Sequence, residues 1–138
     1  MTALSLDALA RDVALAPLHA WLKVKVLDLD ATTGSVTVEL PFRGEFRRAP
    51  DRPEFHGGII SALIDLAGHA VVAARVGHGV PTIDLRVDYL RMAAGAHLKA
   101  VAQPVKIGRT IAVIDIQVFD PENRVVAVGR GAFSTRQG

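Results

Sequence analysis

A stripe of polar residues interrupts an otherwise apolar stretch near the middle of the chain. Ser61, Asp65 and His69 lie four residues apart within residues 59–76, so they share one face if this stretch is helical. A carboxylate among apolar side chains costs free energy unless it is paired or performs a chemical task. Asp65 is therefore a candidate nucleophile or general base. Its alternative role is a structural hydrogen bond to Ser61, to His69 or to a nearby strand.

A His-Gly-Gly sequence, His56 to Gly58, comes directly before this stretch. Glycines let a substrate approach the backbone closely, and the first turn of a helix offers unpaired N–H groups at the positive end of the helix dipole. This combination can stabilise an oxyanion. The alternative is structural: Gly57 and Gly58 form a tight bend, and His56 packs against the helix or caps it.

The spacing between Gly57 and Asp65 bears on how many chains form a site. Eight residues separate them, which is about 12 Å along a helix axis. One helix therefore cannot direct both the Gly57 N–H and the Asp65 carboxylate at one carbonyl. Two antiparallel copies side by side would place Gly57 of one chain beside Asp65 of the other. If both groups serve one site, the spacing predicts a dimer with two shared sites.

The elements that must position these residues follow from periodicity. Residues 59–76 are apolar on nearly every face, which predicts a buried helix, and residues 6–13 predict a short amphipathic helix that ends before Pro17. Residues 42–54 form a long charged loop, a type of loop that is often functional. Loose or clear alternation predicts six strands, at residues 19–29, 35–40, 82–90, 97–106, 110–119 and 125–133.

This order of elements predicts an α+β fold with an antiparallel sheet against one long helix. The helix is too apolar to be covered on one face only, so either the sheet curls around it or a partner chain covers the rest. Along residues 82–90, alternation places Arg86 and Asp88 on the face opposite to Val87 and Tyr89.

Composition excludes several classes of protein. The 138 residues are half hydrophobic and fit a single domain over residues 1–138, with residues 1–17 as an N-terminal helix. There is no cysteine, which excludes disulfides and thiolate sites, and His56 and His69 are too widely spaced for a metal site, so we expect no cofactor. The lack of a Gly-x-Ser-x-Gly sequence argues against a serine hydrolase.

The charge pattern and the N-terminus indicate where the protein works. The net charge of +2 comes without a basic stripe, which argues against a nucleic-acid partner. The N-terminal residues lack the features of a signal peptide, and no stretch reaches 18 uncharged apolar residues. We therefore expect a cytoplasmic protein with no membrane partner.

Four sequence features together resemble the PaaI-like branch of the hotdog-fold acyl-CoA thioesterases, over residues 16–133: FHGGIISALIDLA, TIDLRVDYLR, KIGR and VVAVGRGAF. The resemblance implies an antiparallel sheet wrapped around the long helix. It also implies homodimers whose sheets join, associated into homotetramers. The implied reaction is hydrolysis of acyl-CoA or aryl-acyl-CoA substrates to the free acid and CoA.

The same resemblance implies roles for individual residues. Asp65 matches the carboxylate that attacks the thioester carbonyl or activates water, and Gly57 of the partner chain matches the N–H that polarises the carbonyl. His56 is expected to orient the site, and Thr82 to help place the water or the carboxylate. Further candidates for substrate binding are Gly58, Ser61, Arg91, Lys106, Gly108 and Arg109, of which the last four match positions near the CoA phosphates, anions that Arg binds well.

The sequence departs from the family pattern at three places. The loop directly before His56 usually has a Gly and few charges, whereas residues 51–55 here are Asp-Arg-Pro-Glu-Phe. Pro50 stands six residues before His56, where many relatives have Asn, and Met92 replaces the usual Pro after the Tyr-Leu-Arg sequence. Other functions stay open. They are a non-catalytic acyl-CoA-binding module, a hotdog dehydratase (whose different motif is not found here), and a structural oligomer in which Asp65 is a buried pairing residue.

Overall fold

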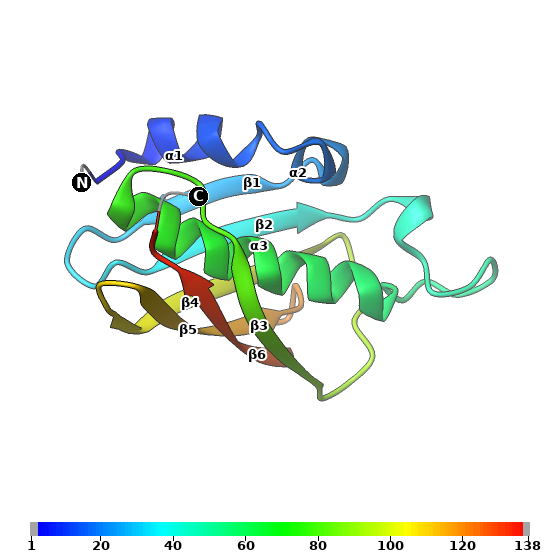
Figure 1. Cartoon of the computed structure of the whole chain (residues 1–138). Coiled ribbons are helices and arrows are strands. Elements are labelled where there is room, and N and C mark those ends of the chain that lie inside the picture. The colour runs from blue at the N-terminus through cyan, green and yellow to red at the C-terminus, as the bar shows by residue number, and fades with distance from the viewer. Residues whose placement is uncertain (1–2, 137–138) are drawn as a thin grey trace.

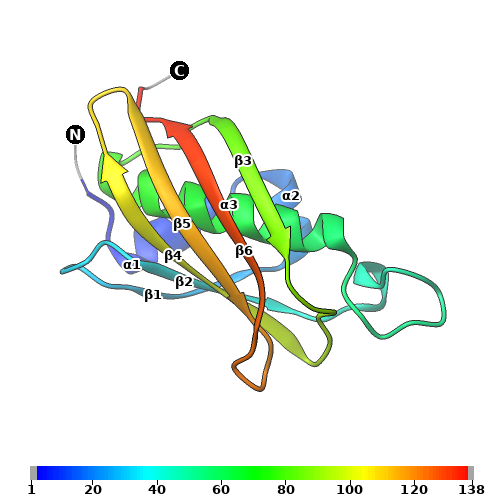
Figure 2. The ribbon, with the colours of Figure 1, turned by 90° about the horizontal axis from the view of Figure 1, so that it is seen from below.

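The long helix α3 (Gly57–Val76) lies against a curved, antiparallel six-stranded sheet (Figures 1 and 2). The structure is a computed structural model that describes residues 3–136. Two short helices, α1 (Leu6–Val13) and α2 (Pro17–Leu22), precede the sheet, and a 3-10 turn, η1, spans Gly44–Phe46. The strands are β1 (Lys25–Leu29), β2 (Val36–Pro41), β3 (Thr82–Tyr89), β4 (His97–Ile107), β5 (Ile111–Phe119) and β6 (Val125–Ser134). The α+β fold class predicted from the sequence is confirmed.

The order of strands across the sheet is β1-β2-β4-β5-β6-β3, and every neighbouring pair is antiparallel. β3 follows α3 in the chain but lies at the edge of the sheet, beside the last strand (Figure 2). Within residues 3–136, β3 pairs only with β6, so the backbone groups along its other edge have no strand partner. Such an edge is a template for pairing with another chain.

The core lies between α3 and the sheet. Leu63, Ile64 and Leu66 of α3 are almost completely buried, and α1 packs across both β1 and the C-terminal part of α3 (Figure 1). Gly68 allows α3 to lie close to β6, because a Cβ there would lie 2.7 Å from a ring carbon of Phe133. The helix is therefore covered by the sheet on one side and by α1 over part of the other.

The composition of α3 suits this buried position. It is the one helix in the described part of the chain that is long and apolar enough to cross a membrane by those two criteria, and 67% of its apolar window is buried inside the fold. The core helix of a folded domain passes the same test.

Two predicted boundaries were wrong. The helix expected at residues 59–76 begins at Gly57, because His56 caps it: the Nδ1 atom of His56 accepts a hydrogen bond from the Gly58 N–H at 2.8 Å. The strand expected at residues 19–29 is only β1. The N-terminal helix expected before Pro17 is α1, which ends at Val13, but Pro17 also begins a second helix, α2, in the first helical position that proline favours. Lys23 ends α2 in the left-handed conformation.

Candidate active site

Asp65 lies half-buried on α3 and accepts a hydrogen bond from the Thr82 hydroxyl at 2.6 Å. Thr82 opens β3, and Tyr89 at the other end of β3 also contacts α3. Strict alternation would place residues 82 and 89 on opposite faces, because they are seven residues apart. A register shift between Thr82 and Asp84 reconciles the two contacts. This bulge aims the Thr82 hydroxyl at the carboxylate, a common use of bulges beside active sites.

The start of α3 leaves a single N–H group available. The Gly58 N–H bonds to the His56 ring, and the N–H groups of Ile59 and Ile60 bond to the His56 carbonyl at 3.0 and 3.2 Å. The His56 N–H itself bonds to the Phe46 carbonyl at 2.7 Å. In this first turn, the Gly57 N–H alone has no acceptor among residues 3–136. Of the two predicted glycines, only Gly57 can therefore donate to a ligand from its present position.

Tyr89 is a site residue that the sequence did not single out. Its hydroxyl donates to the Gly57 carbonyl at 2.8 Å and also contacts the Ser61 hydroxyl. A tyrosine hydroxyl has one hydrogen, so Ser61 is the donor in the second contact. The sequence signal that could have identified Tyr89 was its alternation with Leu85 and Val87, which places it on the strand face toward the helix. The predicted substrate-binding residue Ser61 thus belongs to the Tyr89–Gly57 group.

The polar stripe on α3 does not form one network. Ser61 bonds to Tyr89, Asp65 bonds to Thr82, and the Nδ1 atom of His69 lies 3.1 Å from the Val80 carbonyl. Burial lowers the pKa of His69 below its ordinary value, which favours the neutral ring. His69 is therefore a partly buried histidine with a structural hydrogen bond, and Asp65 has Thr82 as its hydrogen-bond partner.

The two halves of the expected site lie apart in one chain. Gly57 with Tyr89 is at one end of β3 and Asp65 with Thr82 is at the other. The eight-residue separation along α3 corresponds to about 12 Å, as the sequence predicts. A single chain therefore does not bring the Gly57 N–H and the Asp65 carboxylate to one carbonyl.

The four residues predicted to lie near the CoA phosphates are also divided between the two ends of the sheet. Lys106, Gly108 and Arg109 lie at the hairpin between β4 and β5. Ile107 pairs with Ala112, Ala112 with Phe133, and Phe133 with Thr82, so this hairpin shares the sheet end with Thr82. Arg91 follows Tyr89 and lies at the opposite end, where it lines a cavity with Gly57.

The loop before α3 is held by a buried carboxylate. Glu54 forms ion pairs with Arg52 at 2.7 Å and with Arg48 at 3.4 Å. The hydrogen bond from Arg52 lowers the pKa of Glu54 to about 2. Pro50, in the same loop, is exposed and has no side-chain donor or acceptor to offer the site.

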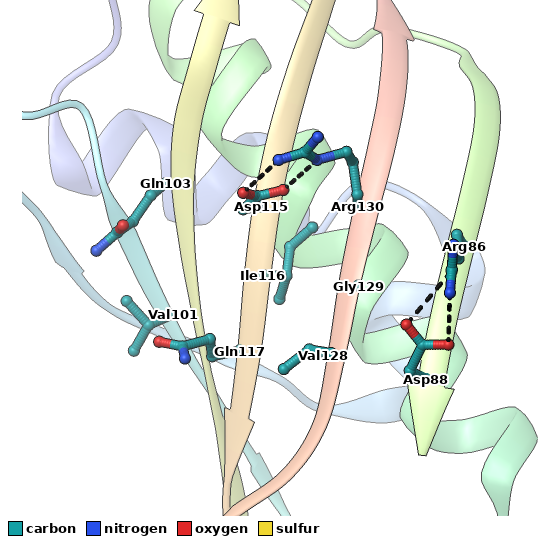
Figure 3. A pocket seen from close by; sticks show the side chains of 10 residues that line it. All are labelled: Arg86, Asp88, Val101, Gln103, Asp115, Ile116, Gln117, Val128, Gly129 and Arg130. Carbon is teal, nitrogen blue, oxygen red and sulfur yellow. Dashed lines mark hydrogen bonds and ion pairs between the residues drawn. The ribbon is translucent and has the colours of Figure 1, made fainter. Parts of the chain in front are cut away.

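A hollow of about 560 Å³ on the outer face of the sheet contains none of the expected site residues (Figure 3). Arg86 and Asp88 point to this face, as alternation predicts, and form an ion pair at 3.3 Å. Arg130 donates to both carboxylate oxygens of Asp115 at 2.6 and 2.9 Å, and this contact lowers the pKa of Asp115. The charged side chains among the described residues that line the hollow are thus paired with one another, and none of them is left as an unpaired nucleophile or base. In the described part of the chain, no three His, Asp or Glu side chains group closely enough to hold a metal ion.

Several known proteins similar to this chain carry thioesterase or esterase names. Residues 55–127 match the family model described as the thioesterase superfamily. A protein of Halobacterium salinarum, provisionally named an esterase, is 39% identical over 115 residues, which cover 75% of this chain and 76% of that protein. A solved structure of a thioesterase-superfamily protein is 34% identical, has a TM-score of 0.88 and covers 95% of this chain and 98% of that one. A variant of the phenylacetic acid degradation protein PaaI from Thermus thermophilus is 28% identical, with a TM-score of 0.74 and coverage of 86% and 98%.

Proposed function

Because this chain belongs to the thioesterase superfamily and has the hotdog fold of its PaaI-like members, we propose that it hydrolyses acyl-CoA thioesters to the free acid and CoA. The family supports hydrolysis of thioesters or esters in general. The acyl-CoA substrate and the residue roles given below are our proposal. They rest on the groups found at the two ends of β3.

One observation carries the proposal: within residues 3–136 one edge of β3 has no strand partner, and Thr82 with Asp65 lies at one end of β3 while Tyr89 with Gly57 lies at the other. When the β3 strands of two chains pair antiparallel along these edges, each end of one strand lies beside the opposite end of the other. The partner's Asp65 then lies beside Gly57, and a second site forms by symmetry. The minimal active unit is a homodimer, and two homodimers associate into a tetramer.

The proposed reaction begins with the thioester carbonyl oxygen accepting a hydrogen bond from the Gly57 N–H, which stabilises the oxyanion as it forms. The partner's Asp65 then attacks the carbonyl carbon and expels the CoA thiolate, leaving an anhydride that water hydrolyses. Alternatively, this carboxylate takes a proton from the water that attacks. Thr82 of the same partner chain donates to the carboxylate and holds its orientation, and His56 holds the turn that presents Gly57.

The pairing also supplies cations for the CoA phosphates. The hairpin at residues 106–109 shares the sheet end with Thr82, so the partner's hairpin comes to the end where Gly57 lies. Lys106 and Arg109 are exposed there, and the Gly108 N–H bonds to the Ile111 carbonyl at 2.9 Å, which fixes the turn. We assign the phosphates to these two side chains of the partner.

The test is release of thiol from a panel of acyl-CoA and aryl-acyl-CoA thioesters. Asp65→Asn is expected to lower kcat by about 100-fold or more, because it removes the nucleophile or base, and to leave the circular dichroism spectrum unchanged. The matched control is Asp84→Asn, an exposed aspartate on β3 outside both groups. A rate for Asp65→Asn equal to that of the wild type contradicts the assignment.

A second candidate is an acyl-CoA-binding module without turnover, which the exposed Pro50 favours because it supplies no amide to the site. This alternative predicts that CoA thioesters bind and that no member of the panel is hydrolysed. Calorimetric titration of the wild type with the same panel separates the two functions. Turnover by the wild type that is lost in Asp65→Asn excludes the binding module.

A further inference from the structure

A cavity of about 390 Å³ adjoins Gly57, between the loop before α3 and the end of β3. Its walls are mainly apolar and include Phe55, Ile60, Leu90 and Met92. Gly57 itself forms part of the lining, so the cavity begins where the proposed carbonyl site lies. A volume of this size is in the range of small-ligand pockets, which are roughly 300–1,000 Å³.

The charge on this cavity is positive. Arg48 and Arg91 line it, and no carboxylate is among the described residues of its lining. Glu54 neutralises Arg48 only in part, because its Oε1 atom lies 3.4 Å from Arg48 but 2.7 Å from Arg52. Arg91 forms no ion pair with any residue between 3 and 136. An unpaired guanidinium at the rim of an apolar pocket is suited to a carboxylate or a phosphate.

Length distinguishes a carboxylate on the acyl group from a CoA phosphate as the anion that this cavity can hold. A sphere with the volume of this cavity is about 9 Å across. The pantetheine arm of CoA is as long as about four extended residues, or roughly 14 Å. With the thioester at Gly57, an extended arm carries the first phosphate beyond the cavity. A short acyl chain with a carboxylate at its far end fits within it.

We infer that this cavity holds the acyl group of the substrate, and that Arg91, assisted by Arg48, binds a carboxylate at the far end of that group. The preferred substrates are then thioesters of dicarboxylic acids. This inference rests on the proposed thioesterase function and adds to it the chemical class of the acyl group.

The experiment compares hexanoyl and adipoyl thioesters, which differ by a terminal carboxylate. Each acyl group is offered on CoA and on N-acetylcysteamine, which has no phosphate. The wild type is expected to show a kcat/KM for adipoyl about tenfold or more above that for hexanoyl with both thiols, the effect of a hydrogen bond to a charged group. Arg91→Gln should remove this difference with both thiols, mainly by raising KM for adipoyl.

Arg75→Gln is the matched control, because Arg75 is an exposed arginine at the other end of α3 and should leave the adipoyl preference in place. Equal or slower hydrolysis of adipoyl by the wild type would overturn the inference while the thioesterase function stands. An Arg91→Gln loss that is confined to CoA substrates and equal for both acyl groups would assign Arg91 to the phosphates and also overturn it. No hydrolysis of any of the four thioesters would overturn this inference, and it would overturn the proposed function as well if the aryl-acyl-CoA members of the panel are also not hydrolysed.

Discussion

At the scale of single residues, the first turn of α3 divides its N–H groups between structure and chemistry. The His56 ring and carbonyl accept hydrogen bonds from the N–H groups of the three residues that follow Gly57, whereas the Gly57 N–H has no acceptor among residues 3–136. A histidine cap thus does more than begin the helix. By satisfying the neighbouring donors, it leaves one N–H for a substrate oxygen.

Replacing Gly57 with proline tests this donor directly. Proline suits the first helical position, and the ψ of His56, 138°, is the extended value that a residue before proline adopts. Gly57→Pro should therefore keep the helix and lower kcat by about 100- to 1,000-fold, because an oxyanion donor is lost.

Gly57→Ala is the control for that variant, since it keeps the N–H and its Cβ would lie an ordinary 3.4 Å from the Tyr89 ring. Steady-state kinetics on one acyl-CoA substrate compares the two variants. Equal activity in the proline and alanine variants would exclude this N–H from the reaction.

Tyr89 acts on the same turn as a positioning residue. Its hydroxyl bonds to the Gly57 carbonyl and so restrains the backbone of the residue whose N–H donates, while the Ser61 hydroxyl holds the tyrosine in place. Tyr89→Phe should lower kcat roughly three- to tenfold, the effect of one neutral hydrogen bond, with little change in KM. The kcat and KM values for Tyr89→Phe and Ser61→Ala are measured side by side. An effect of Tyr89→Phe on KM alone would instead make Tyr89 a substrate contact.

At the scale of elements, the loop at residues 42–54 is held by the carboxylate of Glu54. Its pKa of about 2 lies below the ordinary glutamate value of about 4.3. A group with a lowered pKa in the folded state stabilises the fold above its unfolded pKa, and this contribution is lost as the pH falls through the folded value. The Glu54 ion pairs therefore stabilise the protein at neutral pH and weaken between about pH 4 and pH 2.

This sign predicts the behaviour of Glu54→Gln. The urea midpoint of the variant should lie below that of the wild type at pH 7, and the difference should shrink as the pH is lowered from about 4 toward 2. Glu45→Gln, which alters an exposed glutamate of η1, serves as the control and should show no such change. A difference between Glu54→Gln and wild type that is independent of pH would mean that packing, not charge, holds the loop.

At the scale of the whole molecule, a shared site makes a prediction that a single-chain site does not. Asp65→Asn and Gly57→Pro chains should each be inactive alone. In a mixed dimer, one site combines the intact Gly57 of the first chain with the intact Asp65 of the second. Unfolding and refolding an equal mixture should therefore restore about one quarter of the wild-type activity, because half of the dimers carry one intact site of two.

Sedimentation of the refolded mixture supplies the accompanying control, since it verifies that the activity is carried by dimers or larger assemblies. Activity no higher than that of the separate variants would place Gly57 and Asp65 in one chain's site, or would remove one of them from the reaction.

The sequence determined much of this picture through local periodicity. The apolar run of α3 marked the buried helix, and the single carboxylate within it marked Asp65. Alternation located the strands and the outward face of β3 that carries Arg86 and Asp88. Residues 19–22 were misassigned to a strand, because their weak alternation competes with the signal of Pro17, and a proline begins a helix as readily as it follows one.

Only the tertiary structure decided how these pieces meet. The Thr82–Asp65 and Tyr89–Gly57 bonds join residues 17 and 32 positions apart, and such contacts depend on strand register. Register across the sheet also separated Arg91 from the hairpin at residues 106–109. A bulge in β3 changes which face a side chain takes, and spacing along the chain does not reveal it. Sequence periodicity reports the environment of each segment, whereas the pairing of segments arises from packing of the whole chain.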